Sequence, residues 1–168
     1  MTESKFLIIN LIMMVFIFFI SLLLATFYVN GDQIYYNMFY NNLQYLNFYD
    51  GLDFYKYALS SREYVYFLLV WVFSFFGVSH IVFVAFFNAI LSYFIVKLFY
   101  DWKVNIWIIL TFVFTNYYML VLYFSAERLK FGILFIIVSL LYLERPKSFI
   151  FYLILSVMSH AQMIILYA

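Results

Sequence analysis

The chain contains no cysteine, a single proline and only four glycines among its 168 residues. The absence of cysteine excludes disulfide bonds, thiolate nucleophiles and cysteine-ligated metals. The glycines form neither a phosphate-binding loop nor a Gly-x-Ser-x-Gly nucleophile elbow, and the sequence has no His-Glu-x-x-His zinc motif. Nucleotide-driven transport and zinc-dependent hydrolysis therefore have no support, and we expect neither a metal site nor a cofactor.

Charge is also scarce. Charged residues make up 10% of the chain and the net charge is +1, so the basic footprint of a nucleic-acid-binding protein is missing. Hydrophobic residues instead make up 69%, whereas a soluble domain has roughly 45–50% apolar residues. In water such a chain would expose too much apolar surface. We therefore expect an all-α, polytopic transmembrane helical bundle that forms one membrane domain over residues 1–168.

The long apolar runs predict about five to six membrane elements. Residues 6–29 exceed the ~20 residues that a spanning helix needs, and no cleavage site follows them, so we expect an uncleaved first span with a cytoplasmic N-terminus. Residues 64–96 are interrupted from Gly77 to His80, which favours a broken or re-entrant element; two ordinary spans are the alternative. Further helices are expected at 104–124, 126–143 and 149–168.

The polar segment 30–63 is expected to lie in the membrane interface. It contains an amphipathic pattern in which aromatic and aliphatic residues occupy one helical face and amides another (Tyr36, Phe39, Tyr40, Leu43 against Asn37, Asn41, Gln44). Asp32, with Tyr35, Tyr36 and Tyr40, has the carboxylate and aromatic groups that bind sugars. An aromatic interface belt is the other interpretation of the same residues.

The distribution of basic residues indicates an orientation. If residues 64–96 cross the membrane once, five basic residues lie inside and four outside (Lys5, Lys97, Lys103, Arg145, Lys147 against Lys56, Arg62, Arg128, Lys130). If they cross twice, the count becomes three inside and six outside. The single crossing is favoured, and it puts residues 30–63 and 126–130 on the outer side, together with the distal end of the helix that carries His160.

The five-residue segment Ala126–Lys130, which contains three charged residues, interrupts the apolar run of 104–143. Ser125 resembles an N-cap, so Arg128 and Lys130 are expected in the first turn of a helix, where they oppose the helix dipole. A doubly charged anion such as pyrophosphate would make this arrangement favourable, since arginine binds phosphate in bidentate fashion. The alternative is an interfacial loop whose basic side chains snorkel and pair with Glu127.

Two histidines lie in apolar surroundings. His160 is expected inside a membrane helix one turn after Ser156, which makes it a candidate for proton transfer; a buried histidine that ties helices together is the alternative. His80 follows the break at Gly77 and is expected to be structural.

In their order along the chain, these residues resemble the EpsG-like branch of the Wzy-type bacterial polysaccharide polymerases. Gly31-Asp32-x-x-Tyr35-Tyr36 is similar to the family's first aspartate–tyrosine element, and Arg62-Glu63-Tyr64 stands where the family has a glutamate. Ala126-Glu127-Arg128-Leu129-Lys130 stands at the arginine motif, and Ser159-His160 at the late histidine. Many members have glutamine where this chain has Leu129. Because members are longer, we expect this chain to be the N-terminal portion of such a protein.

The resemblance implies a function in O-antigen, capsule or exopolysaccharide synthesis at the outer face of the bacterial cytoplasmic membrane. The implied substrate is an oligosaccharide repeat unit on undecaprenyl pyrophosphate, and a chain-length regulator protein is an implied partner. The family pattern assigns Arg128, helped by Lys130, to the pyrophosphate. His160 is then an acid/base or hydrogen-bonding group, Asp32 and Glu63 are carboxylates that activate the acceptor or bind sugar, and Tyr35 and Tyr36 contact sugar. A transporter or flippase of lipid-linked glycans, or an inactive remnant, is the alternative function.

Overall fold

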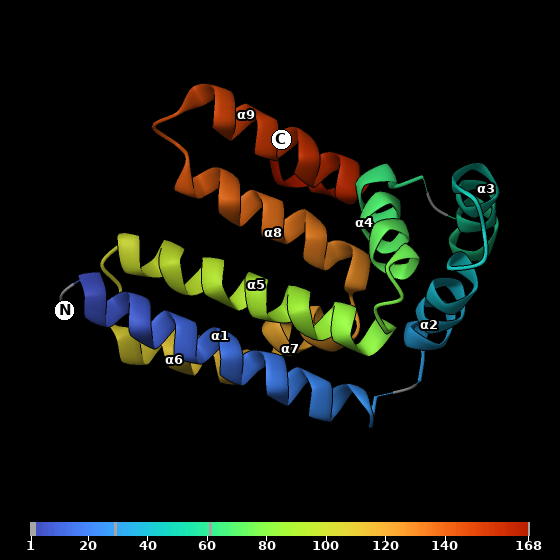
Figure 1. The fold of residues 1–168 in the computed structure, drawn as a ribbon. Coiled ribbons are helices and arrows are strands. Elements are labelled where there is room, and N and C mark those ends of the chain that lie inside the picture. Colours follow the sequence, from blue (N-terminus) through green and yellow to red (C-terminus); the bar gives the residue numbers. More distant parts are fainter. Residues whose placement is uncertain (1–2, 29, 61, 168) are drawn as a thin grey trace.

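The computed structural model describes residues 3–28, 30–60 and 62–167, and within them the chain is helical without strands. Figure 1 shows the arrangement of the helices. They are α1 (Glu3–Ala25), α2 (Asp32–Leu43), α3 (Phe48–Leu59), α4 (Tyr64–Phe75), α5 (His80–Asp101), α6 (Ile106–Thr115), α7 (Tyr117–Phe124), α8 (Glu127–Leu141), α9 (Pro146–Ser159) and the 3₁₀ helix η1 (Ala161–Tyr167). The predicted all-α helical bundle is confirmed.

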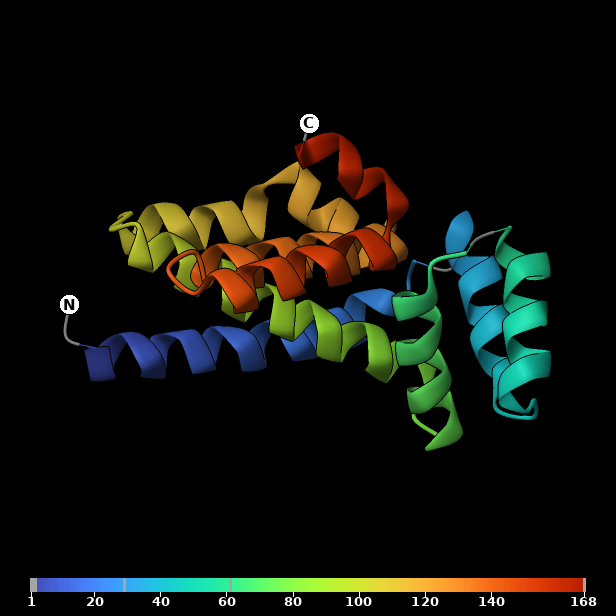
Figure 2. The same cartoon turned by 90° about the horizontal axis from the view of Figure 1, so that it is seen from above.

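Antiparallel neighbours form the body of the bundle. The ring of Phe6 at the start of α1 stacks on Tyr100 near the end of α5, with centroids 3.7 Å apart. In the same pair of helices Asn10 Nδ2 donates to the carbonyl of Tyr93 at 3.2 Å. Helices α8 and α9 form a hairpin beside α5, while α2, α3 and α4 stand across one end of the bundle (Figures 1 and 2).

Two of the described helices, α1 and α5, are long and apolar enough to cross a membrane, and the bent pair α6–α7 makes a third if it is counted as one span. Helices α4 and α9 are apolar but shorter. Many large hydrophobic side chains of α1 are exposed, as expected of a helix that faces lipid rather than protein.

The run 104–124, predicted as one span, is broken at Asn116. Helices α6 and α7 meet there at a bend of 54°. The Asn116 backbone is extended, and its side chain accepts the N–H groups of Tyr118 and Met119 as the N-cap of α7. Asparagine competes in this way for backbone donors, which is why it begins a new helix rather than continuing the old one.

The interruption predicted between residues 64 and 96 is confirmed, with α4 before it and α5 after it. Gly77 adopts a positive φ of 70°, and Ser79 caps α5 by accepting the N–H of Val82. The lengths of the two helices are unequal. Helix α4 has 12 residues, whereas α5 has 22 because it continues beyond residue 96, where the apolar run ends, as far as Asp101. The i,i+4 ion pair from Lys97 Nζ to Asp101, at 3.1 Å, supports this last turn.

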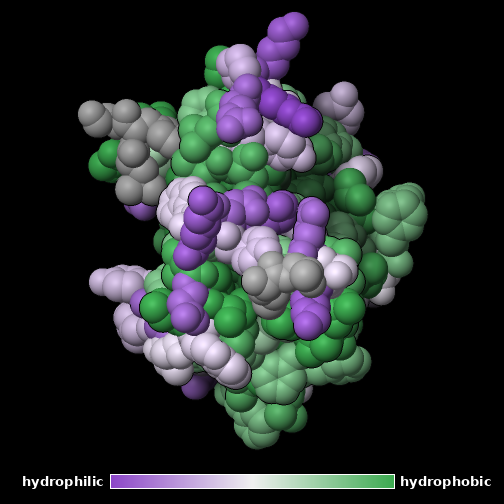
Figure 3. Space-filling view, turned by 90° about the vertical axis from the view of Figure 1, so that its left-hand side faces the viewer, coloured by the Kyte–Doolittle hydropathy of each residue, from purple (hydrophilic) through white to green (hydrophobic). Residues whose placement is uncertain are grey.

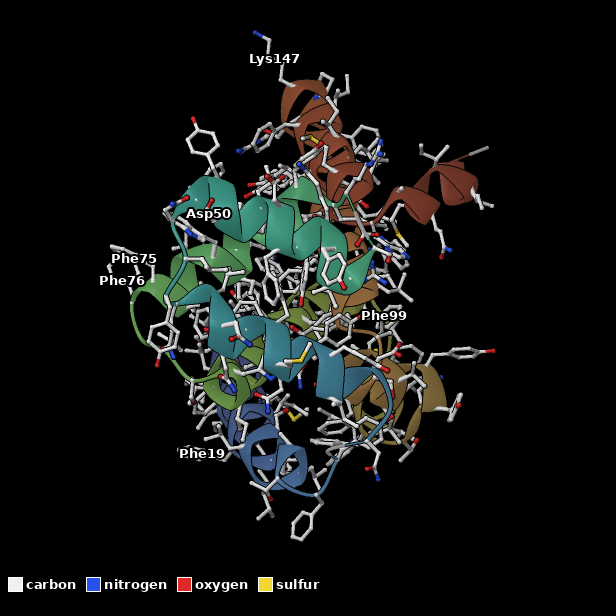
Figure 4. All side chains as sticks on the ribbon, turned by 90° about the vertical axis from the view of Figure 1, so that its right-hand side faces the viewer. Phe19, Asp50, Phe75, Phe76, Phe99 and Lys147 are labelled. Carbon is white, nitrogen blue, oxygen red and sulfur yellow. The ribbon has the colours of Figure 1, made fainter. Side chains whose placement is uncertain are left out.

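The polar segment 30–60 folds into two helices that lie across the end of the bundle (Figure 4). The buried face of α2 consists of the residues predicted from its periodicity, namely Tyr36, Phe39, Tyr40 and Leu43. Helix α3 was not predicted. Asn47 begins it by accepting the N–H of Asp50 at 3.0 Å, and Figure 4 shows Asp50 at this start, on the outer side of the molecule.

The opposite end of the bundle holds the start of α1, the end of α5 and the α8–α9 loop. A surface pocket lined by Asp101, Trp102, Glu144 and Arg145 joins the last two of these segments. Figure 3 looks onto this end, where hydrophilic side chains gather at the centre of the face. The five basic residues predicted on the inner side lie in or next to these segments, whereas the other four lie in α3, just before α4 and in the first turn of α8. The two sets are thus at opposite ends of the bundle (Figure 1), and their assignment to the two sides of a membrane stays a prediction.

Candidate functional site

Four side chains from distant parts of the sequence meet where α2, α4, α8 and α9 come together. Glu63 Oε2 accepts a hydrogen bond from Arg128 Nη1 at 3.2 Å, and Glu63 Oε1 lies 2.5 Å from His160 Nδ1. Arg128 Nε donates to the Tyr36 hydroxyl at 3.2 Å. We call Tyr36, Glu63, Arg128 and His160 the charged cluster. All four are among the residues singled out from the sequence.

His160 reaches the charged cluster because α9 ends before it. The residue was predicted inside a helix spanning 149–168, and this is wrong. Its backbone is extended, with φ −157° and ψ 109°, and η1 follows. The Ser156 hydroxyl bonds the carbonyl of Gly132 at 2.8 Å and ties α9 to α8 instead. Nε2 of His160 lies 3.1 Å from Gln162 Oε1, so each ring nitrogen faces an acceptor oxygen and an imidazolium donates to both.

A pocket of about 210 Å³ opens beside the charged cluster. Arg128 and Tyr36 form part of its wall, and Asp32 and Tyr35 from the first turn of α2 form another part. The side chain of Arg128 is 28% exposed, so it is accessible from this pocket although it is held at its inner end by Glu63. We call this the charged pocket. Four of the seven predicted site residues line the charged pocket, and Glu63 and His160 of the charged cluster lie beside it. Six of the seven therefore come together here, and Lys130 does not.

Lys130 lies elsewhere. It is 1% exposed, and its Nζ donates to the backbone carbonyl of Tyr123 at 3.3 Å. Residues two apart on a helix differ by about 200° around its axis, so Arg128 and Lys130 face opposite sides of α8. The expectation that both bind the same pyrophosphate therefore fails on geometry. Ser125 is not the N-cap of α8 either. It is the C-cap of α7, and its hydroxyl bonds that of Tyr28 at 2.8 Å.

The Arg128 guanidinium retains hydrogen-bonding capacity. Nη1 and Nε are engaged by Glu63 and Tyr36, whereas Nη2 forms no hydrogen bond with the residues that the structure describes. The other partner, Tyr36, belongs to α2, which is not one of the candidate membrane spans. Burial raises the pKa of the Tyr36 hydroxyl above its ordinary value, and the neighbouring Arg128 opposes this shift. The phenol is therefore neutral at physiological pH. Its oxygen accepts from Arg128, while its proton remains available for a ligand.

A second, fully buried group adjoins the charged cluster, and the sequence did not predict it. Glu127 is 1% exposed; one of its carboxylate oxygens accepts from the Tyr66 hydroxyl at 2.9 Å, and the other lies 3.0 Å from His80 Nε2. The alternative interpretation, in which Glu127 pairs with the snorkelling basic side chains of an interfacial loop, therefore does not hold: its partners are Tyr66 and His80. The sequence held one signal, a histidine directly after a helix break, but nothing that paired it with residue 127.

No group of three or more His, Asp or Glu side chains suited to a metal ion occurs in the part of the chain that the structure describes. Nor do known proteins supply an identity. No family model, no curated protein and no solved structure matches this chain.

Proposed function

We propose that the chain belongs to a membrane polysaccharide polymerase of the EpsG-like, Wzy type, acting on oligosaccharide units carried by undecaprenyl pyrophosphate. The observation that carries the proposal is the convergence of Tyr36, Glu63, Arg128 and His160 beside a pocket that Asp32 and Tyr35 also line. The meeting of residues from four sequence motifs that resemble that family supports one shared site.

The chemistry of such a reaction suits these side chains. An acceptor hydroxyl attacks C1 of the donor glycan, the bond from C1 to the pyrophosphate oxygen breaks, and the hydroxyl gives up its proton. Negative charge accumulates on the leaving pyrophosphate, where Arg128 stabilises it by charge-assisted hydrogen bonds. Asp32 is the carboxylate in the pocket that accepts the proton.

Glu63 and Tyr36 act mainly by position in this proposal. Glu63 contacts both Arg128 and His160, and Tyr36 fixes the direction of the guanidinium through Nε. His160, as an imidazolium, adds a second positive charge near the leaving group. A pocket of about 210 Å³ is below the ~300–1,000 Å³ of typical small-molecule sites, so it holds only the reacting end of the lipid-linked glycan.

Two alleles placed in the native host test this function, so that the protein is made as it occurs there. Arg128→Met removes the guanidinium that faces the charged pocket, and Lys130→Met makes the same kind of change on the opposite side of α8. A gel of surface polysaccharide should show single repeat units for Arg128→Met and long chains for Lys130→Met. If Arg128→Met keeps the full ladder, the proposal is wrong. If it blocks export of the lipid-linked units instead of their joining, the protein is a transporter.

A further inference from the structure

A second pocket, of about 400 Å³, lies between the end of α1, helix α2, the start of α5 and the end of α7. We call it the neutral pocket, because its lining among the described residues includes no Asp, Glu, Lys or Arg. The volume is within the ~300–1,000 Å³ usual for small-molecule sites. The proposed function makes no use of it.

One wall of the neutral pocket is a row of amides. Gln33, Asn37 and Asn41 follow one another at intervals of four residues, so they line a single stripe along α2. Asn41 Nδ2 donates to Asn37 Oδ1 at 3.2 Å, which leaves the Asn37 amide nitrogen and the Asn41 oxygen for a ligand. Each amide side chain offers both donors and an acceptor.

His80 forms another part of the lining and is 6% exposed. Glu127 holds its Nε2, and because a carboxylate oxygen is an acceptor, this ring nitrogen carries the proton. Nδ1 forms no hydrogen bond with any of the described residues, and in the neutral imidazole it is the acceptor. Beside the ring, at a centroid distance of 5.2 Å, stands Tyr40, whose buried hydroxyl also has no partner among the described residues. A buried hydroxyl in this condition is uncommon, but Tyr40 does not itself line the pocket, so the unpaired ring nitrogen that the pocket offers is Nδ1 of His80.

The remaining lining is apolar and includes Ile81 and Phe124. A charged ligand would lose its hydration here without gaining a countercharge, which is costly. A hydrocarbon would leave the amides and the imidazole unpaired. A sugar ring satisfies both surfaces, since its hydroxyls donate and accept while its C–H faces lie against apolar side chains.

We propose that the neutral pocket binds an uncharged sugar residue, with Asn37, Asn41 and His80 as its hydrogen-bonding groups. The two pockets adjoin at the first turn of α8, where Glu127 holds His80 of the neutral pocket and the next residue, Arg128, lines the charged one. Under the proposed function this sugar belongs to one of the two glycan units that react beside Arg128. That assignment rests on the proposed function, whereas the binding of sugar does not.

Photolabelling tests the binding without any reaction. The protein in lipid nanodiscs is exposed to an alkyl glucoside that carries a diazirine on its sugar end, and labelled peptides are identified by mass spectrometry. We expect labels on α2 and the first turn of α5, displaced by unlabelled octyl glucoside but not by octanol or octyl phosphate. If octanol displaces the label as well as octyl glucoside does, the pocket is a hydrocarbon groove, and if octyl phosphate does so, it is an anion site. If neither helix is labelled, there is no site. Each of these three results overturns the proposal.

A matched pair of variants localises the effect. Asn37→Leu combined with Asn41→Leu should lower the affinity for octyl glucoside at least about tenfold, equivalent to about 1.4 kcal/mol. Asn42→Leu alters the same helix but not the pocket, since the Asn42 side chain bonds the carbonyl of Met38, and it should bind as the wild type does. Equal losses in both would contradict the proposal. Glucoside binding that persists while Arg128→Met leaves the polysaccharide ladder intact would remove the polymerase and keep the sugar site.

Discussion

Replacing Gly132 by alanine tests the packing that brings His160 to the charged cluster. Gly132 lies in α8, and a Cβ placed there would stand 2.8 Å from Met163 Cγ and 3.1 Å from His160 Cβ. Both neighbours belong to the segment that begins where α9 ends. Overpacking of this kind typically costs about 1–3 kcal/mol, because the neighbours must shift. Any shift of the His160 side chain also disturbs its contact with Glu63.

Gly51 in α3 is the matched control. A Cβ there would meet its nearest neighbours, Trp71, Leu43 and Phe67, at 3.6–3.8 Å, which is ordinary van der Waals contact. Both substitutions replace a helical glycine by alanine and gain about 1 kcal/mol in helix propensity. That gain cancels in the comparison, so Gly132→Ala should be less stable than Gly51→Ala by the overpacking cost alone.

The assay is thermal unfolding of the two purified variants in the same detergent, followed by intrinsic fluorescence. With about 2–4 °C per kcal/mol for a chain of this size, the midpoint of Gly132→Ala should lie roughly 2–12 °C below that of Gly51→Ala. In cells, Gly132→Ala should also shorten the polysaccharide, since His160 is displaced. Equal midpoints for the two variants would refute the close approach of α8 to the chain beyond Ser159.

Three further predictions concern the two polar groups and the orientation. Tyr66→Phe removes the buried hydrogen bond to Glu127 and should lower the free energy of unfolding by about 1.5–3 kcal/mol. The control Tyr64→Phe changes an exposed side chain and should lower it by less than about 0.5 kcal/mol, so equal effects of the two variants would contradict the buried pair. Glu63→Gln should reduce long-chain polysaccharide on the gel at least about tenfold, because Arg128 loses its anionic partner, and an unchanged ladder would remove Glu63 from the mechanism. Reporter fusions should place the α8–α9 loop on the cytoplasmic side and the end of α3 on the other; the same side for both would contradict the orientation.

Periodicity and composition predicted the features that depend on local pattern. The buried face of α2 follows directly from the spacing of Tyr36, Phe39, Tyr40 and Leu43, since a helix of 3.6 residues per turn puts them on one side. The helical bundle follows from the apolar runs, and the break before His80 follows from Gly77. In each case the sequence pattern lies within a few residues of the structural feature that it predicts.

Features that depend on side-chain competition or on distant partners were missed. Asn116 lies in a predominantly apolar run, and only its capping of α7 shows that it divides the run into two helices. Arg128 and Lys130 look equivalent in the sequence, yet one faces a pocket and the other a buried carbonyl. The pairing of Glu127 with His80 joins residues 47 positions apart, and no local pattern encodes such a contact.

Binding of a short isoprenoid pyrophosphate is the most direct test of the central claim that Arg128 and its neighbours form a site for a lipid-linked pyrophosphate. Native mass spectrometry of the purified protein should show binding of farnesyl pyrophosphate, but not of farnesol, to the wild type and to Lys130→Met. Arg128→Met should weaken that binding at least about tenfold, because the charge-assisted hydrogen bonds to phosphate are lost. If Arg128→Met binds farnesyl pyrophosphate as tightly as Lys130→Met does, the charged cluster is not the pyrophosphate site.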